Sequence, residues 1–233
     1  KVTEMMNNGI PRVIGLIPDG NRRWARERGL PPIKGHERGI KVLEDFLDWC
    51  REKGIKTVII YGLSEDNLKR PPHELHALFS LYERNLRKAL NDKKIHEHKV
   101  RIEIYSTNLK ALPTSLKEAI KEIMKATRNY AKYCIKILLA WSAQKEILHA
   151  LKKVYNFARK GLPLPDLKEF LMVKDYPDLV IRTGGEMRIS DFLSVQLRYS
   201  EIYVIDKYFP ACTREDWERA LNWFMNRERR FGR

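Results

Sequence analysis

Hydrophobic and polar positions follow two alternating patterns along the chain. Short apolar runs, typical of strands, are separated by longer stretches in which apolar residues recur every three or four positions, as on one face of a helix. The apolar runs predict strands at 12–18, 56–63, 99–106, 134–141, 177–185 and 201–209. The periodic stretches predict helices at 35–54, 71–90, 112–130, 142–161, 189–200 and 213–230.

This alternation determines the expected fold class. Strands separated by helices of this length need crossover connections, and crossovers favour parallel strands. We therefore expect an α/β fold, with a mostly parallel central sheet of about six strands flanked by helices. The sequence contains no repeat and no long Gly/Ser linker, so we expect residues 1–233 to form a single domain.

The net charge of the chain indicates the kind of partner it binds. With 45 Lys and Arg against 30 Asp and Glu, the formal net charge of +15 predicts an anionic partner. Nucleic acid, phosphorylated small molecules and an acidic membrane surface all fit the charge. No RNP-like, helix-turn-helix or zinc-finger signature accompanies it, so nucleic acid is not expected. Cys50, Cys134 and Cys212 lie far apart without a CxxC pair, which argues against disulfides and fits the cytoplasm.

Polar residues suited to anion binding follow three of the predicted strands. They are Asp19 to Arg23 after the first strand, Ser64, Asn67 and Arg70 after the second, and Arg182, Gly184, Gly185, Arg188 and Ser190 after the fifth. In open parallel sheets, ligands bind beyond the carboxyl ends of the strands. Arginines bind phosphate oxygens through paired donors, and a glycine pair lets backbone N–H groups converge on an anion. The pattern predicts two phosphorylated ligands, or one long one, at this edge.

Asp19 is an isolated carboxylate among these arginines. An acidic residue is unexpected in a phosphate site, unless it holds a divalent cation together with the substrate phosphates, as is typical of Mg²⁺. Each element also has an ordinary interpretation: Asp-Gly-Asn is a common turn, and Gly-Gly often marks only a tight turn. Three strand ends of the same character favour the anion site.

Five segments in order resemble the motifs of cis-prenyltransferases, the family of undecaprenyl and dehydrodolichyl diphosphate synthases. The resemblance runs from about Pro11 to Gly232, and the form PDGNRRWA is similar to archaeal and eukaryotic members. The segments are IPDGNRRWA (17–25), GHERG (35–39), YGLSEDNLKRP (61–71), DLVIRTGGEMRISDFL (178–193) and RERRFG (227–232). The resemblance implies a non-Rossmann fold of the undecaprenyl diphosphate synthase type. It also implies a Mg²⁺-dependent transferase that condenses isopentenyl diphosphate with an allylic diphosphate to a polyprenyl diphosphate, the precursor of a glycosyl carrier lipid.

The resemblance also implies roles for individual residues. Asp19, with Asn67 and Ser64 near the site of proton removal, would be catalytic, and Asp19 and Glu201 would bind the metal. Arg182, Arg188 and Ser190 would bind isopentenyl diphosphate. The allylic diphosphate would be held by Gly20, Asn21, Arg22, Arg23, Trp24, His36 and Arg70. The terminal Arg-Phe-Gly resembles a segment that reaches a partner subunit, which implies a homodimer, and the basic charge suits peripheral contact with a membrane that receives the product.

Departures from the family pattern keep alternatives open. Pro32 stands where the family usually has an arginine, and Leu68 where it has an aromatic residue. These changes leave room for a relative that transfers a prenyl group to a non-standard acceptor. A subunit of a heteromeric enzyme is the other alternative, although such subunits typically lose the motif Asp and the RTGGE residues that this chain retains. The amphipathic helices at 39–50 and 76–86 are candidate walls of an apolar tunnel, and ordinary core packing explains their pattern equally well.

Overall fold

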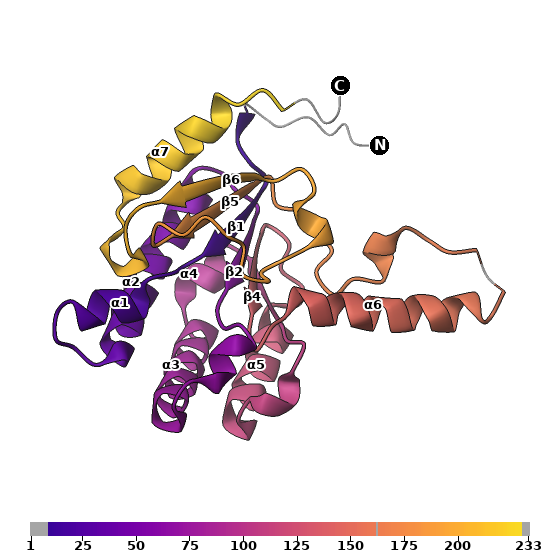
Figure 1. The fold of residues 1–233 in the computed structure, drawn as a ribbon, viewed down its shortest axis with the longest axis horizontal. Coiled ribbons are helices and arrows are strands. Elements are labelled where there is room, and N and C mark those ends of the chain that lie inside the picture. Colours follow the sequence, from indigo (N-terminus) through magenta and orange to yellow (C-terminus); the bar gives the residue numbers. More distant parts are fainter. Residues whose placement is uncertain (1–8, 162, 230–233) are drawn as a thin grey trace.

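The six predicted strands form one sheet in which all strands are parallel (Figure 1). This computed structural model describes residues 9–161 and 163–229. The strand order is β3-β4-β2-β1-β5-β6. The strands are β1 (Val13–Ile17), β2 (Thr57–Tyr61), β3 (Val100–Tyr105), β4 (Tyr133–Leu138), β5 (Leu179–Thr183) and β6 (Glu201–Ile205). The α/β class and the six-stranded parallel sheet are confirmed.

Five of the six predicted helices are present, and two short ones were not predicted. The helices are α1 (Asn21–Arg26), α2 (Pro32–Glu52), α3 (Pro72–Leu90), α4 (Lys93–Glu97), α5 (Thr114–Thr127), α6 (Ala143–Ala158) and α7 (Arg214–Met225). Proline begins α2 and α3, where its missing N–H costs nothing. A capping box of Thr213 and Asp216 begins α7, as the predicted Thr cap requires.

The prediction of a helix over 189–200 is wrong. This segment consists of turns with one 3₁₀ turn at Val195–Leu197. Ser190 and Asp191 have φ values of 47° and 61°, which an α-helix excludes. The Asp191 carboxylate instead accepts hydrogen bonds from the Ser142 hydroxyl (2.6 Å) and the Gln144 backbone N–H (3.1 Å), at the start of α6. The apolar residues of this segment therefore pack against the sheet, although the segment is not a helix.

The two faces of the sheet are covered differently. Helices α2, α3, α5 and α7 cover one face, where Phe46 and Trp217 pack on β1 and β5 and the α3–α5 pair packs on β3. The irregular segments around Val173 and Phe192 cover the other face. Helix α6 extends away from the body of the protein, at the right of Figure 1. The central strands β1, β2 and β5 are buried on both faces, which explains their nearly continuous apolar runs.

The strand order places a switch point beside β1. The chain passes from β1 to β2 on one side, and β5 lies on the other side of β1. In parallel sheets, the crevice at such a point, beyond the carboxyl ends of the strands, is the usual place for a ligand. Here the crevice lies between the segments that follow Ile17 and Thr183, which are aligned through the pair Ile17–Arg182.

Helices α1 and α2 pack closely because two glycines of the GHERG segment lie between them. A Cβ atom at Gly35 would lie 1.9 Å from the backbone oxygen of Asn21, and one at Gly39 would lie 2.3 Å from the Asn21 Oδ1 atom. The glycines of this motif are therefore required for packing, and their position fixes α1 at the mouth of the crevice.

We expect Gly35→Ala to lower the free energy of unfolding by about 1–2 kcal/mol. Alanine is the better helix former by ~1 kcal/mol. The added methyl group would lie 1.9 Å from a backbone oxygen and must displace the backbone of α1, so the cost falls in the upper part of the overpacking range, at about 2–3 kcal/mol. Urea denaturation of the variant measures the difference. Lys41→Ala, at an exposed position of the same helix, is the control and should change stability by less than about 0.5 kcal/mol. Equal stability of Gly35→Ala and wild type would contradict the packing role.

Candidate active site

Asp19 lies at the centre of the crevice, directly after β1. Its Oδ1 atom accepts a hydrogen bond from the Gly20 N–H (2.6 Å) and lies 3.4 Å from Arg23 Nη2. Its Oδ2 atom accepts a hydrogen bond from Arg182 Nη2 (2.8 Å). Gly20 adopts φ 99°, and a side chain there would collide with Tyr208, so only glycine allows this turn. One carboxylate is thus held between two guanidinium groups.

Arg182 organises the β5 side of the crevice. Its side chain is only 4% exposed and also donates to the Ser190 hydroxyl (2.9 Å) and to the backbone oxygen of Arg188. Its Nε atom is buried without a hydrogen-bond partner among the described residues. Arg188 is exposed and pairs with Glu186 (2.5 Å), which also pairs with Arg23 (2.9 Å). We call Arg23, Arg182 and Arg188 the β5-side cluster.

The prediction that the N–H groups of the glycine pair are directed at an anion is wrong. The Gly184 N–H donates to the Lys207 carbonyl (2.7 Å) and the Gly185 N–H to the Ile205 carbonyl (3.1 Å), so both are used within the fold. Both glycines adopt positive φ, 88° and 73°. A Cβ at Gly184 would lie 2.7 Å from Arg23 Nη2. The pair therefore serves the turn and the close approach of Arg23, and the arginine side chains are left as the anion donors.

A second group of basic residues, which we call the α3-side cluster, lies across the crevice and consists of Arg22, His36 and Arg70. The buried Glu74 of α3 lies 2.8 Å from Arg22 Nε and 3.9 Å from Arg70 Nε. Arg70 Nη1 and His36 Nε2 are buried and have no hydrogen-bond partner among the described residues. Buried donors of this kind are normally satisfied. Together with the excess of positive charge, they indicate a site prepared for an anion.

His36 is held neutral at this site. Burial, together with the nearby charges of Arg70 and Arg22, lowers its pKa from 6.5 to about 4. A neutral imidazole adds no further repulsion between the two guanidinium groups. The neutral ring can still donate one hydrogen bond and accept another.

The lowered pKa of His36 predicts a loss of stability in acid. Between pH 6.5 and about 4 the unfolded chain binds a proton at this residue and the folded chain does not. The free energy of unfolding therefore has its full His36 contribution above pH 6.5 and loses it as the pH falls toward 4. Denaturation of wild type and His36→Gln at pH 7.5, 5.5 and 4.5 compares the slopes, and a smaller slope is expected for the variant. Parallel slopes would contradict the assignment.

Ser64 and Asn67 follow β2. The Ser64 hydroxyl accepts a hydrogen bond from the Asn67 backbone N–H (3.1 Å), and both residues line the cavity described next. The Tyr61 hydroxyl donates to the carbonyl of Ser190 (3.0 Å) and so ties the end of β2 to the β5 side. Burial raises the pKa of Tyr61 well above its ordinary value, so the hydroxyl remains a donor.

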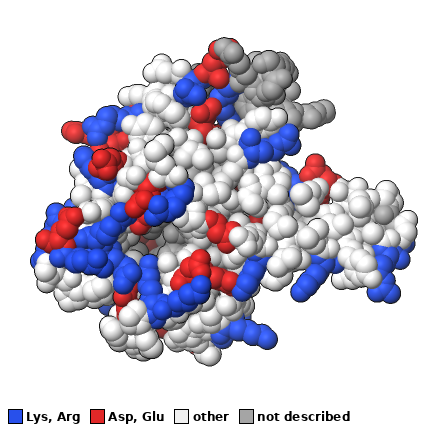
Figure 2. All heavy atoms as spheres, viewed as in Figure 1, with Lys and Arg blue, Asp and Glu red and all other residues white. Residues whose placement is uncertain are grey.

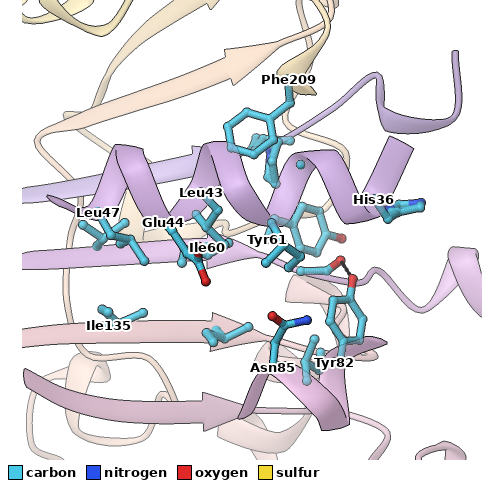
Figure 3. A pocket seen from close by; sticks show the side chains of 18 of the residues that line it. His36, Leu43, Glu44, Leu47, Ile60, Tyr61, Tyr82, Asn85, Ile135 and Phe209 are labelled. Atoms are coloured by element: carbon cyan, nitrogen blue, oxygen red, sulfur yellow. Dashed lines mark hydrogen bonds between the residues drawn. The ribbon is translucent and has the colours of Figure 1, made fainter. Parts of the chain in front are cut away.

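An apolar cavity of about 710 Å³ extends from this polar mouth along the face of the sheet under α2 and α3. Figure 2 shows a hollow on this face, with basic and acidic side chains around it. Figure 3 shows Leu43 and Leu47 of α2 opposite Ile60 and Ile135 of the strands. Leu81, Tyr82 and Leu86 of α3 complete the wall. The helices expected as tunnel walls thus line a cavity, and the same faces also join the core.

Two of the predicted allylic-site residues lie differently from what the motif implies. The Asn21 amide donates to the Pro18 carbonyl (2.8 Å), and its Oδ1 is buried against Gly39, so its side chain mainly joins α1 to α2. Trp24 lies outside the lining of the cavity, and its ring stacks on Arg28 at 4.4 Å. Asn21 remains at the mouth, whereas Trp24 belongs to the outer surface of α1.

Glu201 is not close to Asp19 within the chain. It begins β6 and is aligned with Leu179, which is aligned with Ile14 of β1. Glu201 therefore lies at the amino end of the strands, whereas Asp19 lies beyond their carboxyl ends. It pairs with Arg227 at 3.4 Å. The prediction of a metal site shared by the two carboxylates is wrong for a single chain, because a parallel sheet separates its two edges.

The part of the chain that the structure describes holds no group of three or more His, Cys, Asp or Glu side chains suited to a metal. A cation held by one carboxylate and by substrate phosphates needs no such group, and this is the usual mode for Mg²⁺. Asp19, at the mouth beside two basic clusters, fits that mode. Among the described helices, none is both long and apolar enough to cross a membrane.

Sequence reasoning missed Glu74, Tyr61 and Tyr82. Glu74 lies in the first turn of α3, where an acidic residue is common because it complements the helix dipole. Only its burial, with 8% exposed, reveals its contact with Arg22. The Tyr82 hydroxyl donates to the Gly62 carbonyl (2.6 Å) at the cavity wall.

The predicted Arg-Phe-Gly segment at 230–232 lies outside the described residues.

Comparison with known proteins identifies the family of the chain. The sequence model of the prenyltransferase family described as putative undecaprenyl diphosphate synthase matches residues 17–232. The chain is 41% identical over 232 residues to the tritrans,polycis-undecaprenyl-diphosphate synthase (geranylgeranyl-diphosphate specific) of Pyrococcus furiosus, covering 96% of this chain and 88% of that one. It is 38% identical to the isoprenyl transferase of Thermus thermophilus, covering 99% and 92% of the two chains.

Two solved structures share the fold. One is lavandulyl diphosphate synthase from Lavandula x intermedia in complex with dimethylallyl diphosphate, with a TM-score of 0.90, 27% identity, and coverage of 97% of this chain and 100% of that chain. The other is a probable undecaprenyl diphosphate synthase from Campylobacter jejuni, with a TM-score of 0.79, 28% identity, and coverage of 96% and 99%. With a matched family model over most of its length and relatives at this identity, the chain belongs to the cis-prenyltransferase family.

Proposed function

We propose that the two basic clusters bind the two diphosphates of a cis-prenyl transfer and that the apolar cavity holds the growing chain. The chain is a cis-prenyltransferase that makes a polyprenyl diphosphate. The observation that carries the assignment of the sites is a cavity of about 710 Å³ whose lining includes Asp19, the whole α3-side cluster, and Arg23 and Arg182 of the β5-side cluster. A diphosphate head and a hydrocarbon tail are the two chemistries that this arrangement accommodates.

The α3-side cluster is the proposed site of the allylic diphosphate. Arg22, His36 and Arg70 lie at the mouth directly under α2 and α3, so a tail attached to a diphosphate there enters the apolar space. Arg70 Nη1 and His36 Nε2 supply unused hydrogen-bonding atoms. Isopentenyl diphosphate then takes the β5-side cluster, where Arg182 contacts both Asp19 and Ser190 and the exposed Arg188 lies on the same segment as Ser190.

The reaction requires charge stabilisation more than covalent catalysis. The bond between the allylic carbon and its diphosphate breaks, and the diphosphate leaves with the electron pair. The double bond of isopentenyl diphosphate supplies the electron pair of the new carbon–carbon bond at its terminal carbon, which leaves positive charge on the branched carbon. The CH2 group on the other side of the branched carbon then loses a proton, and its C–H electron pair forms the new double bond. Arg22 and Arg70 hold the leaving diphosphate as its charge increases, and preorganised charges of this kind are usually the largest catalytic contribution. Ser64 and Asn67, which line the cavity, are the proposed groups near that proton.

Mg²⁺ is the proposed cofactor, held by Asp19 together with substrate phosphate. It would neutralise part of the diphosphate charge. Asp19 now accepts hydrogen bonds from Arg182 and Gly20. These contacts orient the carboxylate at the mouth, and its remaining lone pairs are available to the proposed cation.

The size of the cavity favours a long allylic primer. The Pyrococcus furiosus relative is named as specific for geranylgeranyl diphosphate, and we propose a primer of this class here. A methylene group occupies roughly the 30 Å³ of a water molecule in the liquid, so about 710 Å³ holds about two dozen carbon atoms. The lavandulyl diphosphate synthase fold indicates a second candidate, transfer to another allylic diphosphate. Such a short product would leave most of this cavity empty.

We further propose a homodimer. On α6, Leu148, Leu151 and Tyr155 are 56%, 53% and 61% exposed, and their spacing places them along one side of the helix. Helix α6 extends outward from the protein, so this apolar side is accessible to a second copy (Figure 1). Sedimentation analysis of the purified protein distinguishes a dimer from a monomer.

Arg188→Ala tests the assignment of the isopentenyl diphosphate site. We expect the KM for isopentenyl diphosphate to rise about tenfold with a small change in kcat, because the lost contact is present in both the bound state and the transition state. The KM for the allylic substrate should remain within about twofold. Arg198→Ala is the matched control, since Arg198 is on the same segment and stacks on Tyr199. An unchanged KM for isopentenyl diphosphate would contradict the assignment.

A further inference from the structure

The end of the cavity opposite the mouth is lined by charged residues. Glu44 and Asp48 of α2 face Lys88 at the end of α3 and Lys94 of α4, and all four line the cavity. Lys88 Nζ lies 2.7 Å from Glu44 Oε1, and Lys94 Nζ lies 2.7 Å from Asp48 Oδ2. We call these two contacts the distal ion pairs. Figure 3 shows Glu44 beside Leu43 and Leu47, on the side of α2 that faces the strands.

The distal ion pairs are at the surface. Lys88 and Lys94 are 64% and 65% exposed, and Glu44 is 52% exposed. Glu44 and Lys88, with Ile40 and Leu81, line both the cavity and a groove on the outer side of α2 and α3. The wall at this point is therefore one layer of side chains thick. The ion pairs close this end of the cavity because they join α2 to α3 and α4.

The cavity is too small for the whole of a long prenyl chain. At roughly 30 Å³ for each carbon, an undecaprenyl chain, with eleven isoprene units of five carbons, needs roughly twice the space of about 710 Å³. A chain of that length cannot lie wholly inside. Its end must leave the protein, and the distal end is the place where the wall is polar, thin and held by contacts that water and salt weaken.

We propose that the distal ion pairs, Glu44–Lys88 and Asp48–Lys94, limit product length by closing a second opening of the cavity, through which the end of a lengthening prenyl chain leaves the protein. The proposal rests on the proposed function. While the tail is short, the pairs remain intact and the whole chain is enclosed. Further elongation pushes the tail between α2 and the α3–α4 region, so the pairs separate, and elongation slows where the chain meets them.

Charge reversal tests the proposal directly. Asp48→Lys places two ammonium groups opposite each other, which opens the end of the cavity. We expect the ratio of the longest products to intermediate ones to rise about two- to fivefold, the change that corresponds to loss of one exposed ion pair. Asp48→Lys combined with Lys94→Asp restores an ion pair with the charges exchanged, and the product distribution should return toward that of wild type.

The matched control is Glu169→Lys, which reverses the charge of an exposed residue paired with Lys174 at 2.6 Å, far from the cavity lining. Products of labelled isopentenyl diphosphate are sized by chromatography at equal total incorporation. Lys94→Met is the second variant if Asp48→Lys does not fold by circular dichroism. Equal distributions in wild type, the control and the opened variants would overturn the proposal while leaving prenyl transfer intact. Absence of any polyprenyl product from wild type would instead overturn the proposed function.

Discussion

Asp19→Ala is expected to reduce kcat about a thousandfold while the protein stays folded. The carboxylate lies at the mouth between both clusters, and its removal takes away the proposed metal ligand and the partner of Arg182. Asp19 packs against no apolar core, and its side chain is 31% exposed. The free energy of unfolding should fall by about 1–3 kcal/mol, because the buried guanidinium of Arg182 loses its carboxylate partner.

Asp66→Ala is the matched control for this variant. Asp66 also follows a strand at the carboxyl edge of the sheet, but it is 82% exposed and pairs with Lys69 at the surface. Its substitution should leave kcat within about twofold, because an exposed ion pair contributes little. Turnover of Asp19→Ala at the level of Asp66→Ala would contradict the catalytic role of Asp19.

Arg182→Lys has the second largest expected effect. The buried guanidinium contacts Asp19, Ser190 and the backbone oxygen of Arg188 at once, and a lysine ammonium cannot reproduce this planar set of donors. Although the charge is kept, we expect kcat/KM to fall about a hundredfold or more, close to the loss of an oriented electrostatic contact. Steady-state kinetics with both substrates measures the effect.

Arg84→Lys is the control for this change. Arg84 is 67% exposed and lies 3.7 Å from Glu37, so lysine fulfils the same role at that position. A kcat/KM of Arg182→Lys within about threefold of this control would show that charge alone is needed at residue 182, and the positioning role that we assign to its geometry would be lost.

The strands and the edge that carries the site were predictable because both depend on local patterns. The run before Asp19 is buried on both faces, and such runs read as strands without knowledge of the fold. The rule that ligands bind beyond the carboxyl ends of parallel strands then placed Asp19, Arg70 and Arg182 at one edge. The structure brings these three residues together at the mouth of one cavity.

The remaining features depend on contacts between distant residues, which local patterns do not contain. The apolar spacing of 189–200 resembled a helix, but the φ values of Ser190 and Asp191 exclude one. The Gly184–Gly185 pair resembled an anion nest, but its N–H groups bind carbonyls near β6, a strand that follows more than fifteen residues later in the sequence. Glu201 was grouped with Asp19 by motif, and only the strand register separates the two.

The measurement that tests the central claim most directly is an elongation assay. The purified protein is incubated with Mg²⁺, labelled isopentenyl diphosphate and a panel of allylic diphosphates of increasing length, and the products are sized by chromatography. The account predicts a ladder of polyprenyl diphosphates that depends on the allylic primer, is lost on chelation of the metal and is lost in Asp19→Ala. A single short product, or incorporation that continues unchanged in Asp19→Ala, would contradict it.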